Sequence, residues 1–164
     1  MKQLWAPWRM SYVGGDTPSK EDECFLCAVL GGGDDITALV VERAPRTITM
    51  LNRFPYSSGH LMVVPQRHAR DPRELDLEDG GALFAASQRA LSALEDAMHP
   101  DGFNVGLNVG TAAGGSVDHL HLHVVPRWAG DTNFMPVLDD VKVIPEHLAA
   151  TAARLREAFG KRRT

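Results

Sequence analysis

The 164-residue sequence predicts one α+β domain, with an antiparallel sheet of about five strands, one long helix and a C-terminal helix. Short apolar and β-branched runs recur between glycine and proline turns, which is typical of strands. One long segment instead has the spacing of apolar side chains that indicates a helix. Because strands and helices do not alternate along the chain, a βαβ array is disfavoured.

Five runs are predicted as strands, at residues 37–42, 47–52, 60–64, 103–109 and 119–125. A turn at Ala44-Pro45 joins the first two, and a turn containing proline and glycine at 55–59 joins the second to the third. Glycines bound the fourth run, and Pro126 stops the fifth. The long helix is inserted between the third and fourth runs.

The long predicted helix covers residues 76–98. Its apolar side chains that can share one face are Leu83, Ala86, Leu91, Leu94 and Met98. A C-terminal amphipathic helix is predicted at 148–159, and a short helix at 25–30 carries Cys27. The expected organisation is a single domain with an irregular N-terminal segment at 1–23, a core at 24–128 and a C-terminal extension with its helix at 129–164.

Composition excludes several function classes. The net charge of −4 leaves no basic footprint for nucleic acid. No apolar run approaches the roughly 20 residues that a membrane span requires, and the first residues lack the apolar core of a secretory signal. We therefore expect a cytoplasmic protein that binds neither nucleic acid nor membrane. A small anionic substrate would be held locally, by backbone donors and a few side chains.

The run at 119–125 reads His-Leu-His-Leu-His-Val-Val. Because side chains alternate along a strand, His119, His121 and His123 should face one side while the leucines face the core. Imidazoles arranged in this way can ligate a metal or act as nucleophiles and acid–base groups near neutral pH. A merely solvated strand face is disfavoured, because such faces usually carry threonine, lysine or glutamate.

The residues flanking this run also suit a phosphate site. Gly114-Gly115-Ser116 offers a backbone that can approach a phosphate closely and donate N–H groups. Arg127 has a guanidinium that can face phosphate, although a surface arginine is the commoner arrangement. Asp118 alternates to the face opposite His119, which argues against a direct role.

Residues 119–125 resemble the signature of the histidine triad (HIT) family of nucleotide hydrolases and transferases. Residues 51–56 with 59–65 resemble that family's nucleoside-binding strand and turn, and 103–110 resemble the strand before the triad. The resemblance covers about residues 24–128. It implies a HIT-like fold and an enzyme.

The resemblance also implies roles for single residues. The middle histidine, His121, is expected to attack the α-phosphorus and form a nucleotidyl-histidine. The other roles implied are His123 on the phosphate oxygens, Asn108 and Ser116 on the phosphates or leaving group, and Asn52 on the ribose hydroxyls. Backbone N–H groups near Gly115 and Ser116, with His119 or His123, are expected to meet the developing charge, and His123 is favoured if His119 holds a metal.

Cys24 and Cys27 form a C-x-x-C pair, which is half of a tetrahedral zinc site, a redox pair or two buried thiols. A redox pair is the least favoured, because a thioredoxin-like βαβ setting is missing. Some bacterial HIT proteins carry a structural zinc, and the corresponding positions here are Cys24, Cys27, His68 and His119. This set requires the strand to twist near its start, because an untwisted strand would point His119 the same way as His121.

Residues 4–10 and 130–136 resemble a bacterial branch that includes diadenosine tetraphosphate phosphorylases and adenylyltransferases. The resemblance implies cleavage of a dinucleoside polyphosphate through adenylyl-His121, with inorganic phosphate or water resolving the intermediate. No organic cofactor is expected. Trp5 and Trp8 would cap a dimer or core surface or contact adenine.

Other readings stay open. The substrate could be a nucleoside phosphoramidate or an adenylylated amine. A non-catalytic nucleotide-binding or partner-binding module on the same scaffold is a reading of another class, because fold does not determine function. An intact triad disfavours that module. The family resemblance further implies a homodimer formed through the long helix and a neighbouring strand.

Overall fold

The computed structural model describes residues 24–115, 117–131 and 146–161. Its helices and strands are α2 (Phe25–Leu30), β1 (Val40–Ala44), β2 (Thr47–Leu51), β3 (Leu61–Pro65), η3 (Pro72–Glu74), α3 (Leu77–Met98), β4 (Gly102–Leu107), η4 (Thr111–Ala113), β5 (Leu122–Arg127) and α5 (Leu148–Lys161). The strands form one sheet in the order β1-β2-β3-β5-β4, and each neighbouring pair is antiparallel. The predicted fold class is confirmed.

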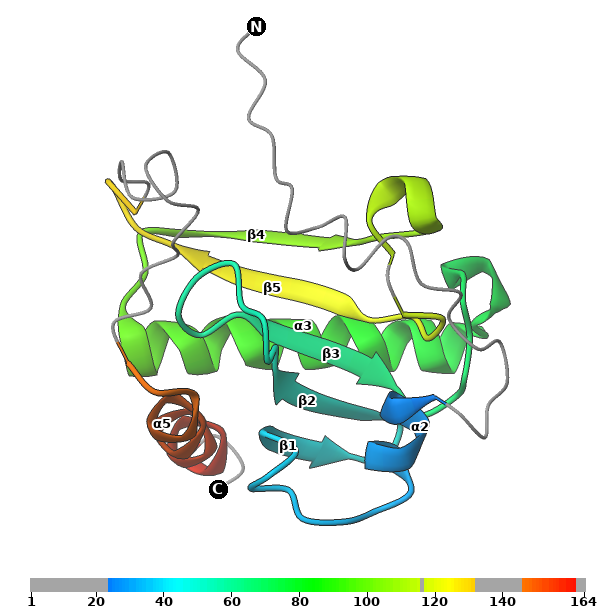
Figure 1. Cartoon of the computed structure of the whole chain (residues 1–164), viewed down its shortest axis with the longest axis horizontal. Helices are drawn as coiled ribbons and strands as arrows, with labels where there is room; N and C mark the ends of the chain where they lie inside the picture. The colour runs from blue at the N-terminus through cyan, green and yellow to red at the C-terminus, as the bar shows by residue number, and fades with distance from the viewer. Residues whose placement is uncertain (1–23, 116, 132–145, 162–164) are drawn as a thin grey trace, which may run out of the picture.

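The sheet separates two apolar clusters. α3 lies across one face, behind the sheet in Figure 1, and α5 packs against both α3 and β1. The larger cluster on this face includes Leu61, Leu94 and Leu155, each with no exposed surface. α2 lies over the other face, where its Leu26 packs with the side chains of Val40, Ile48, Met50, Met62 and Val64. Burial of these apolar side chains on both faces provides the main stabilisation of the fold.

Burial along the strands follows their position in the sheet. β2 and β3 are buried at every residue, because neighbouring strands flank them and helices cover both faces. β4 is an edge strand, and its middle residues are exposed. The edge therefore presents backbone groups and Val105 to the surroundings.

Capping residues mark both ends of α3. Asp76 is its N-cap, because its carboxylate accepts a hydrogen bond from the Asp79 backbone N–H at 2.8 Å. His99 adopts the left-handed conformation at the C-cap. The buried side differs slightly from the predicted face. Leu91 and Met98 are only partly buried, and Ala90 and Ala93 contribute instead.

The first strand starts later than predicted, at Val40 rather than at residue 37. Asp34 explains this difference, because its carboxylate accepts hydrogen bonds from the Ile36 backbone N–H and the Thr37 hydroxyl. Such local bonds hold the chain in a turn and keep it out of the sheet ladder.

The histidine strand also starts later than predicted, at Leu122 rather than at residue 119. Its pairing with β3 ends at Val63↔Leu122. Before that point the backbone N–H of Leu120 donates to the carbonyl of Ala69, outside the sheet, at 2.6 Å. At its other end β5 continues through Pro126, which is tolerated because β5 pairs there with β4 alone.

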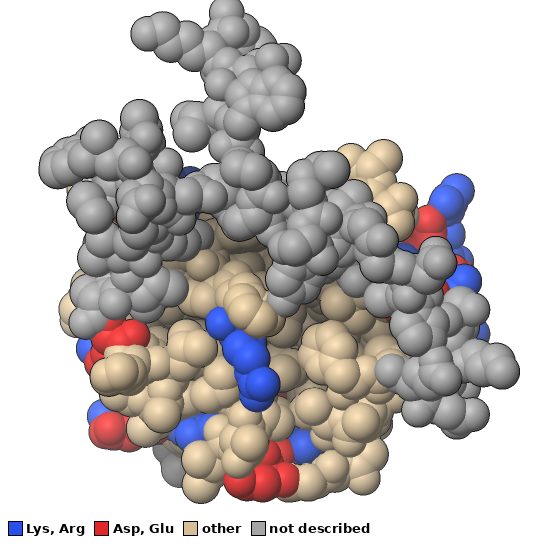
Figure 2. Space-filling view, viewed as in Figure 1, with Lys and Arg blue, Asp and Glu red and all other residues tan. Residues whose placement is uncertain are grey.

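Among the described residues no helix is both long and apolar enough to cross a membrane. On the face shown in Figure 2, the acidic and basic side chains of the described residues are scattered and form no basic field. Several arginines are already paired with carboxylates, such as Arg43 with Asp35 and Arg89 with Glu42.

Candidate active site and metal centre

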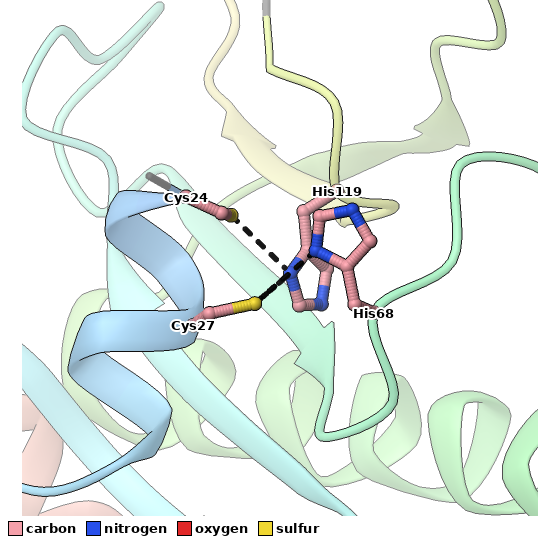
Figure 3. Close-up of side chains that lie close together, drawn as sticks. All are labelled: Cys24, Cys27, His68 and His119. Atoms are coloured by element: carbon pink, nitrogen blue, oxygen red, sulfur yellow. Dashed lines mark hydrogen bonds between the residues drawn. The ribbon is translucent and has the colours of Figure 1, made fainter. Parts of the chain in front are cut away.

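Four side chains predicted as metal ligands come together from three segments. Cys24 and Cys27 project from the start of α2 toward the imidazoles of His68 and His119, as Figure 3 shows. The Sγ of Cys27 lies 3.2 Å from His68 Nδ1 and 3.4 Å from His119 Nδ1, and Cys24 Sγ lies 3.6 Å from His119 Nδ1. All four ligand atoms lie within 4.8 Å of one another.

These distances fit a tetrahedral metal site. Zinc bonded to two sulfurs and two nitrogens places its ligand atoms about 3.3–3.8 Å apart. The His119 ring is oriented for metal binding, because its Nε2–H donates to the carbonyl of Pro65 at 3.0 Å. That bond leaves the lone pair of a neutral imidazole on Nδ1, which faces the sulfurs. The four residues therefore have the donor set and the spacing of a closed zinc site.

His119 does not share a strand face with His121, which differs from the alternation predicted for 119–125. Both residues precede β5, and the backbone there leaves the sheet. The His119 ring contacts the His68 ring edge-on at 4.8 Å between centroids, and His121 instead contacts His123 at 4.7 Å. The turn in the chain thus assigns the first histidine to the cysteine cluster and the other two to a separate site.

His121 has the protonation state that a nucleophile needs. Its Nδ1–H donates to the backbone carbonyl of His119 at 2.8 Å, so the lone pair of the neutral ring is on Nε2. Burial lowers the pKa of the His121 imidazole below its ordinary value of 6.5, and the hydrogen bond to His119 opposes this only in part. The ring is therefore neutral near pH 7 and nucleophilic at Nε2.

Another histidine, His60, has no role in the sequence interpretation but contacts this site through His123. It is fully buried, and its Nδ1 accepts a hydrogen bond from the backbone N–H of Tyr56 at 3.1 Å. Its proton is consequently on Nε2, which lies 2.9 Å from His123 Nδ1 and donates to it. His123 must then carry its own proton on Nε2. The Tyr56 ring stacks on His60 at 4.8 Å and covers it.

His60 could have been found from strand pairing but not from its spacing. It lies two residues before Met62, which is the register partner of His123. Diagonal neighbours on adjacent antiparallel strands are close enough for long side chains to touch. The sequence does not reveal that the third and fifth strands are neighbours.

The remaining predicted site residues are engaged in loops. Asn52 accepts a hydrogen bond from the Phe54 backbone N–H at 2.8 Å, and the amide of Asn108 lies 3.5 Å from the Gly114 carbonyl. The Gly115 N–H donates to the carbonyl of Gly110 at 3.1 Å. A Cβ at Gly115 would lie only 3.0 Å from that same oxygen, so this close turn favours glycine.

Two flanking charges have surface partners. Arg127 donates to Asp131 and Asn104, which agrees with a surface arginine more than with a phosphate ligand. Asp118 pairs with Arg70 at 2.9 Å. Ser116, residues 4–10 with Trp5 and Trp8, and residues 132–136 lie outside the described residues.

The chain is similar to several known proteins of one family. A model of the HIT domain family matches residues 34–130. The AP-4-A phosphorylase of Mycobacterium tuberculosis is 39% identical over 98% of this chain and 86% of that protein. Protein hit of Bacillus subtilis is 30% identical over 77% of this chain and 88% of its own. A crystal structure of a Zn-bound histidine triad family protein from Mycobacterium smegmatis has a TM-score of 0.73 and 28% identity, over 88% of this chain and 98% of that one.

The chain belongs to the HIT domain family. The predictions of the family, of its fold and of an enzyme are thereby confirmed. The roles given to individual site residues stay predictions. The two cysteines precede the part of the chain that the family model matches, whereas His68 and His119 lie inside it.

The hydrogen bond from His60 to His123 yields a first prediction. His60→Phe keeps a buried ring but removes the donor, so His123 should no longer hold its proton on Nε2 alone. Long-range ¹H–¹⁵N spectra of the histidine side chains measure this tautomer directly. The exposed His147, changed to Phe, is the matched control. A His123 that keeps a single Nε2–H tautomer in His60→Phe would show that His60 does not position it.

Proposed function

We propose that the protein cleaves dinucleoside polyphosphates, such as diadenosine tetraphosphate, through a covalent nucleotidyl intermediate on His121. The observation that carries this proposal is the state of His121: a buried, neutral imidazole whose Nδ1–H is held by the His119 carbonyl. A ring held in this way presents Nε2 as a nucleophile. The relative named AP-4-A phosphorylase, similar over nearly the whole chain, supports the choice of substrate.

The proposed reaction has two displacements at the same phosphorus. His121 Nε2 attacks the α-phosphorus, and the bond to the bridging oxygen breaks as the remaining nucleotide leaves. An oxygen of inorganic phosphate then attacks the nucleotidyl-histidine, and the phosphorus–nitrogen bond breaks to return His121. Diadenosine tetraphosphate and phosphate thus yield ATP and ADP. Water as the acceptor would yield ATP and AMP.

In this proposal His123 donates a hydrogen bond to the phosphate oxygens. Its proton is on Nε2 because His60 donates to Nδ1, so it can donate a hydrogen bond where negative charge develops. His119 faces the cysteines and is excluded from that task. Asn52 is proposed for the ribose hydroxyls, and Asn108 with the Gly115-Ser116 backbone for the phosphates.

The decisive experiment separates the products by ion-exchange chromatography after incubation with diadenosine tetraphosphate, with and without inorganic phosphate. ADP plus ATP formed only with phosphate is the expected result. His121→Ala should lower the rate by roughly four to six powers of ten, as loss of a catalytic nucleophile does in other enzymes. His147→Ala, at an exposed histidine, should retain the rate.

Each other outcome has a definite meaning. AMP plus ATP without phosphate would identify water as the acceptor. Turnover that survives His121→Ala would contradict the covalent intermediate. No turnover under either condition would contradict the substrate class and favour a phosphoramidate or adenylyl-amine substrate, or a binding module.

We further propose that the cysteine and histidine tetrad binds a structural zinc. Its spacing fits tetrahedral coordination, and the Zn-bound relative from Mycobacterium smegmatis supports this choice of metal. With four protein ligands the coordination is closed, so the metal takes no part in the reaction and joins α2 to the segment before β5. A cytoplasmic location, in which thiols stay reduced, is part of this proposal.

Metal analysis tests the zinc site. Protein produced with zinc should contain about one zinc per chain, and a Cys27→Ser, His68→Asn double variant should contain little, because two of four ligands are lost. His147→Asn serves as the histidine control. Wild-type protein that contains no zinc after reconstitution under reducing conditions would rule the site out.

We also propose a homodimer formed through β4 and α3. The β4 edge exposes 47% of Val105, and α3 exposes 64% of Phe84, which are large apolar surfaces for a strand edge and a helix to leave to water. Analytical ultracentrifugation should show a dimer that Val105→Lys shifts toward monomer. Ile36→Lys, at an exposed isoleucine in a loop, should leave the dimer intact. A wild-type monomer at micromolar concentration would contradict the proposal.

A further inference from the structure

We propose that Cys24 and Cys27 form a redox-sensitive latch on the nucleophile: oxidation of the pair to a disulfide releases the metal, detaches His119 from the two sulfurs and slows turnover at His121. This inference rests on the proposed function for its effect on activity. Its chemical steps can be measured without any substrate.

The latch depends on His119, whose side chain belongs to the metal tetrad and whose backbone carbonyl contacts His121. The side chain of His119 faces the two sulfurs through Nδ1 at 3.4 and 3.6 Å. Its backbone carbonyl accepts the Nδ1–H of His121 at 2.8 Å and thereby places the lone pair of the nucleophile on Nε2. That carbonyl belongs to the same residue, His119, whose side chain takes part in the metal tetrad. His119 is therefore a positioning residue for His121.

The segment around His119 is also held by burial of the Leu120 side chain in the larger apolar cluster and by the ion pair between Asp118 and Arg70. Leu120 donates one backbone hydrogen bond to Ala69, and His119 Nε2–H donates to the Pro65 carbonyl. The sheet ladder with β3 begins only at Leu122. Because residues 119–121 lie outside that ladder, the tetrad adds to the contacts that orient the His119 carbonyl.

The pair has the geometry for a disulfide. Cys24 is the N-cap of α2 and Cys27 lies in its first turn, with the two Sγ atoms within 4.8 Å of each other. Rotation about the Cα–Cβ bonds must bring them to the S–S length of about 2.05 Å. Each of the two cysteine residues keeps part of its surface exposed. A disulfide and the tetrahedral site exclude each other, because formation of the disulfide consumes the two thiolates that would bind the metal.

The proposed oxidant is hydrogen peroxide. One thiolate sulfur attacks a peroxide oxygen, the O–O bond breaks, and hydroxide leaves a sulfenic acid behind. The second sulfur attacks the first, the S–O bond breaks, and a second hydroxide leaves. The two sulfurs together lose two electrons, and one peroxide molecule is reduced to two hydroxide ions. The zinc ion departs to solvent without a change of charge.

The first part of the test uses the zinc-loaded full chain and no substrate. Hydrogen peroxide should release one zinc per chain to a chromogenic chelator, in step with the loss of two thiols and of two hydrogen atoms in the intact mass. In long-range ¹H–¹⁵N spectra, His121 should change from a pure Nδ1–H tautomer to a mixture of tautomers. Zinc release with an unchanged His121 tautomer would overturn the latch.

The second part measures turnover of diadenosine tetraphosphate. Oxidation should lower kcat about ten- to a hundredfold, the usual effect of losing an outer hydrogen-bond partner, with a smaller change in KM. Dithiothreitol with added zinc should restore kcat, which methionine oxidation would not allow. An oxidised, zinc-free protein that keeps its kcat overturns the latch. An untreated enzyme that never turns over overturns the proposed function instead, and the tautomer measurement still decides the latch.

A double variant, Cys24→Asp with Cys27→His, is the matched control. Carboxylate and imidazole are zinc ligands that cannot form a disulfide. The fraction of its own activity that survives peroxide should stay near one, whereas that of the wild type falls. Equal losses in both proteins would place the peroxide effect elsewhere and contradict the proposal. If the variant does not bind zinc, reversal by dithiothreitol in the wild type decides the question.

Discussion

β3 and β5 pair along a short antiparallel register that ends at Val63↔Leu122, and the arrangement of the site follows from where this pairing stops. Within the register, Met62 faces His123, which puts His60 on the diagonal and within 2.9 Å of the His123 ring. Beyond this register, β3 continues to Pro65, whereas the segment before β5 turns away from the sheet. The carbonyl of Pro65 then accepts a hydrogen bond from His119 and turns the opposite ring nitrogen toward the cysteines.

Two hydrogen-bonding chains assign the protons of His121 and His123 at the candidate active site. One runs from His121 Nδ1–H to the carbonyl of His119, and leaves the lone pair on Nε2. The other runs from the Tyr56 backbone through His60 to His123, and leaves the proton on Nε2. Two chemically identical side chains thus present opposite groups at Nε2. The proposed roles of His121 as nucleophile and His123 as hydrogen-bond donor require this difference between the two environments.

The metal tetrad lies next to these chains and shares His119 with them. Leu26, with the partly buried Val29 and Leu30, and the hydrogen bond from Arg43 to the Val29 carbonyl also hold α2 to the sheet, and the tetrad adds a link to the segment before β5. The proposed metal would fix the position of this shared residue without touching the substrate. The proposed effect of oxidation depends on the same sharing.

The sequence alone determined the α+β class and the five strands with the long inserted helix, and its resemblance to the HIT family implied the four tetrad residues. It did so because period-2 and helical patterns, turn residues and the triad signature are local features of the chain. Tertiary structure alone decided that His119 leaves the strand, that His60 orients His123, and that the Gly115 N–H is used within its own loop. The physical reason is that each depends on a partner distant in sequence. Alternation predicts the direction of a side chain only while the strand has a neighbour to pair with, and no local pattern tells where that pairing ends.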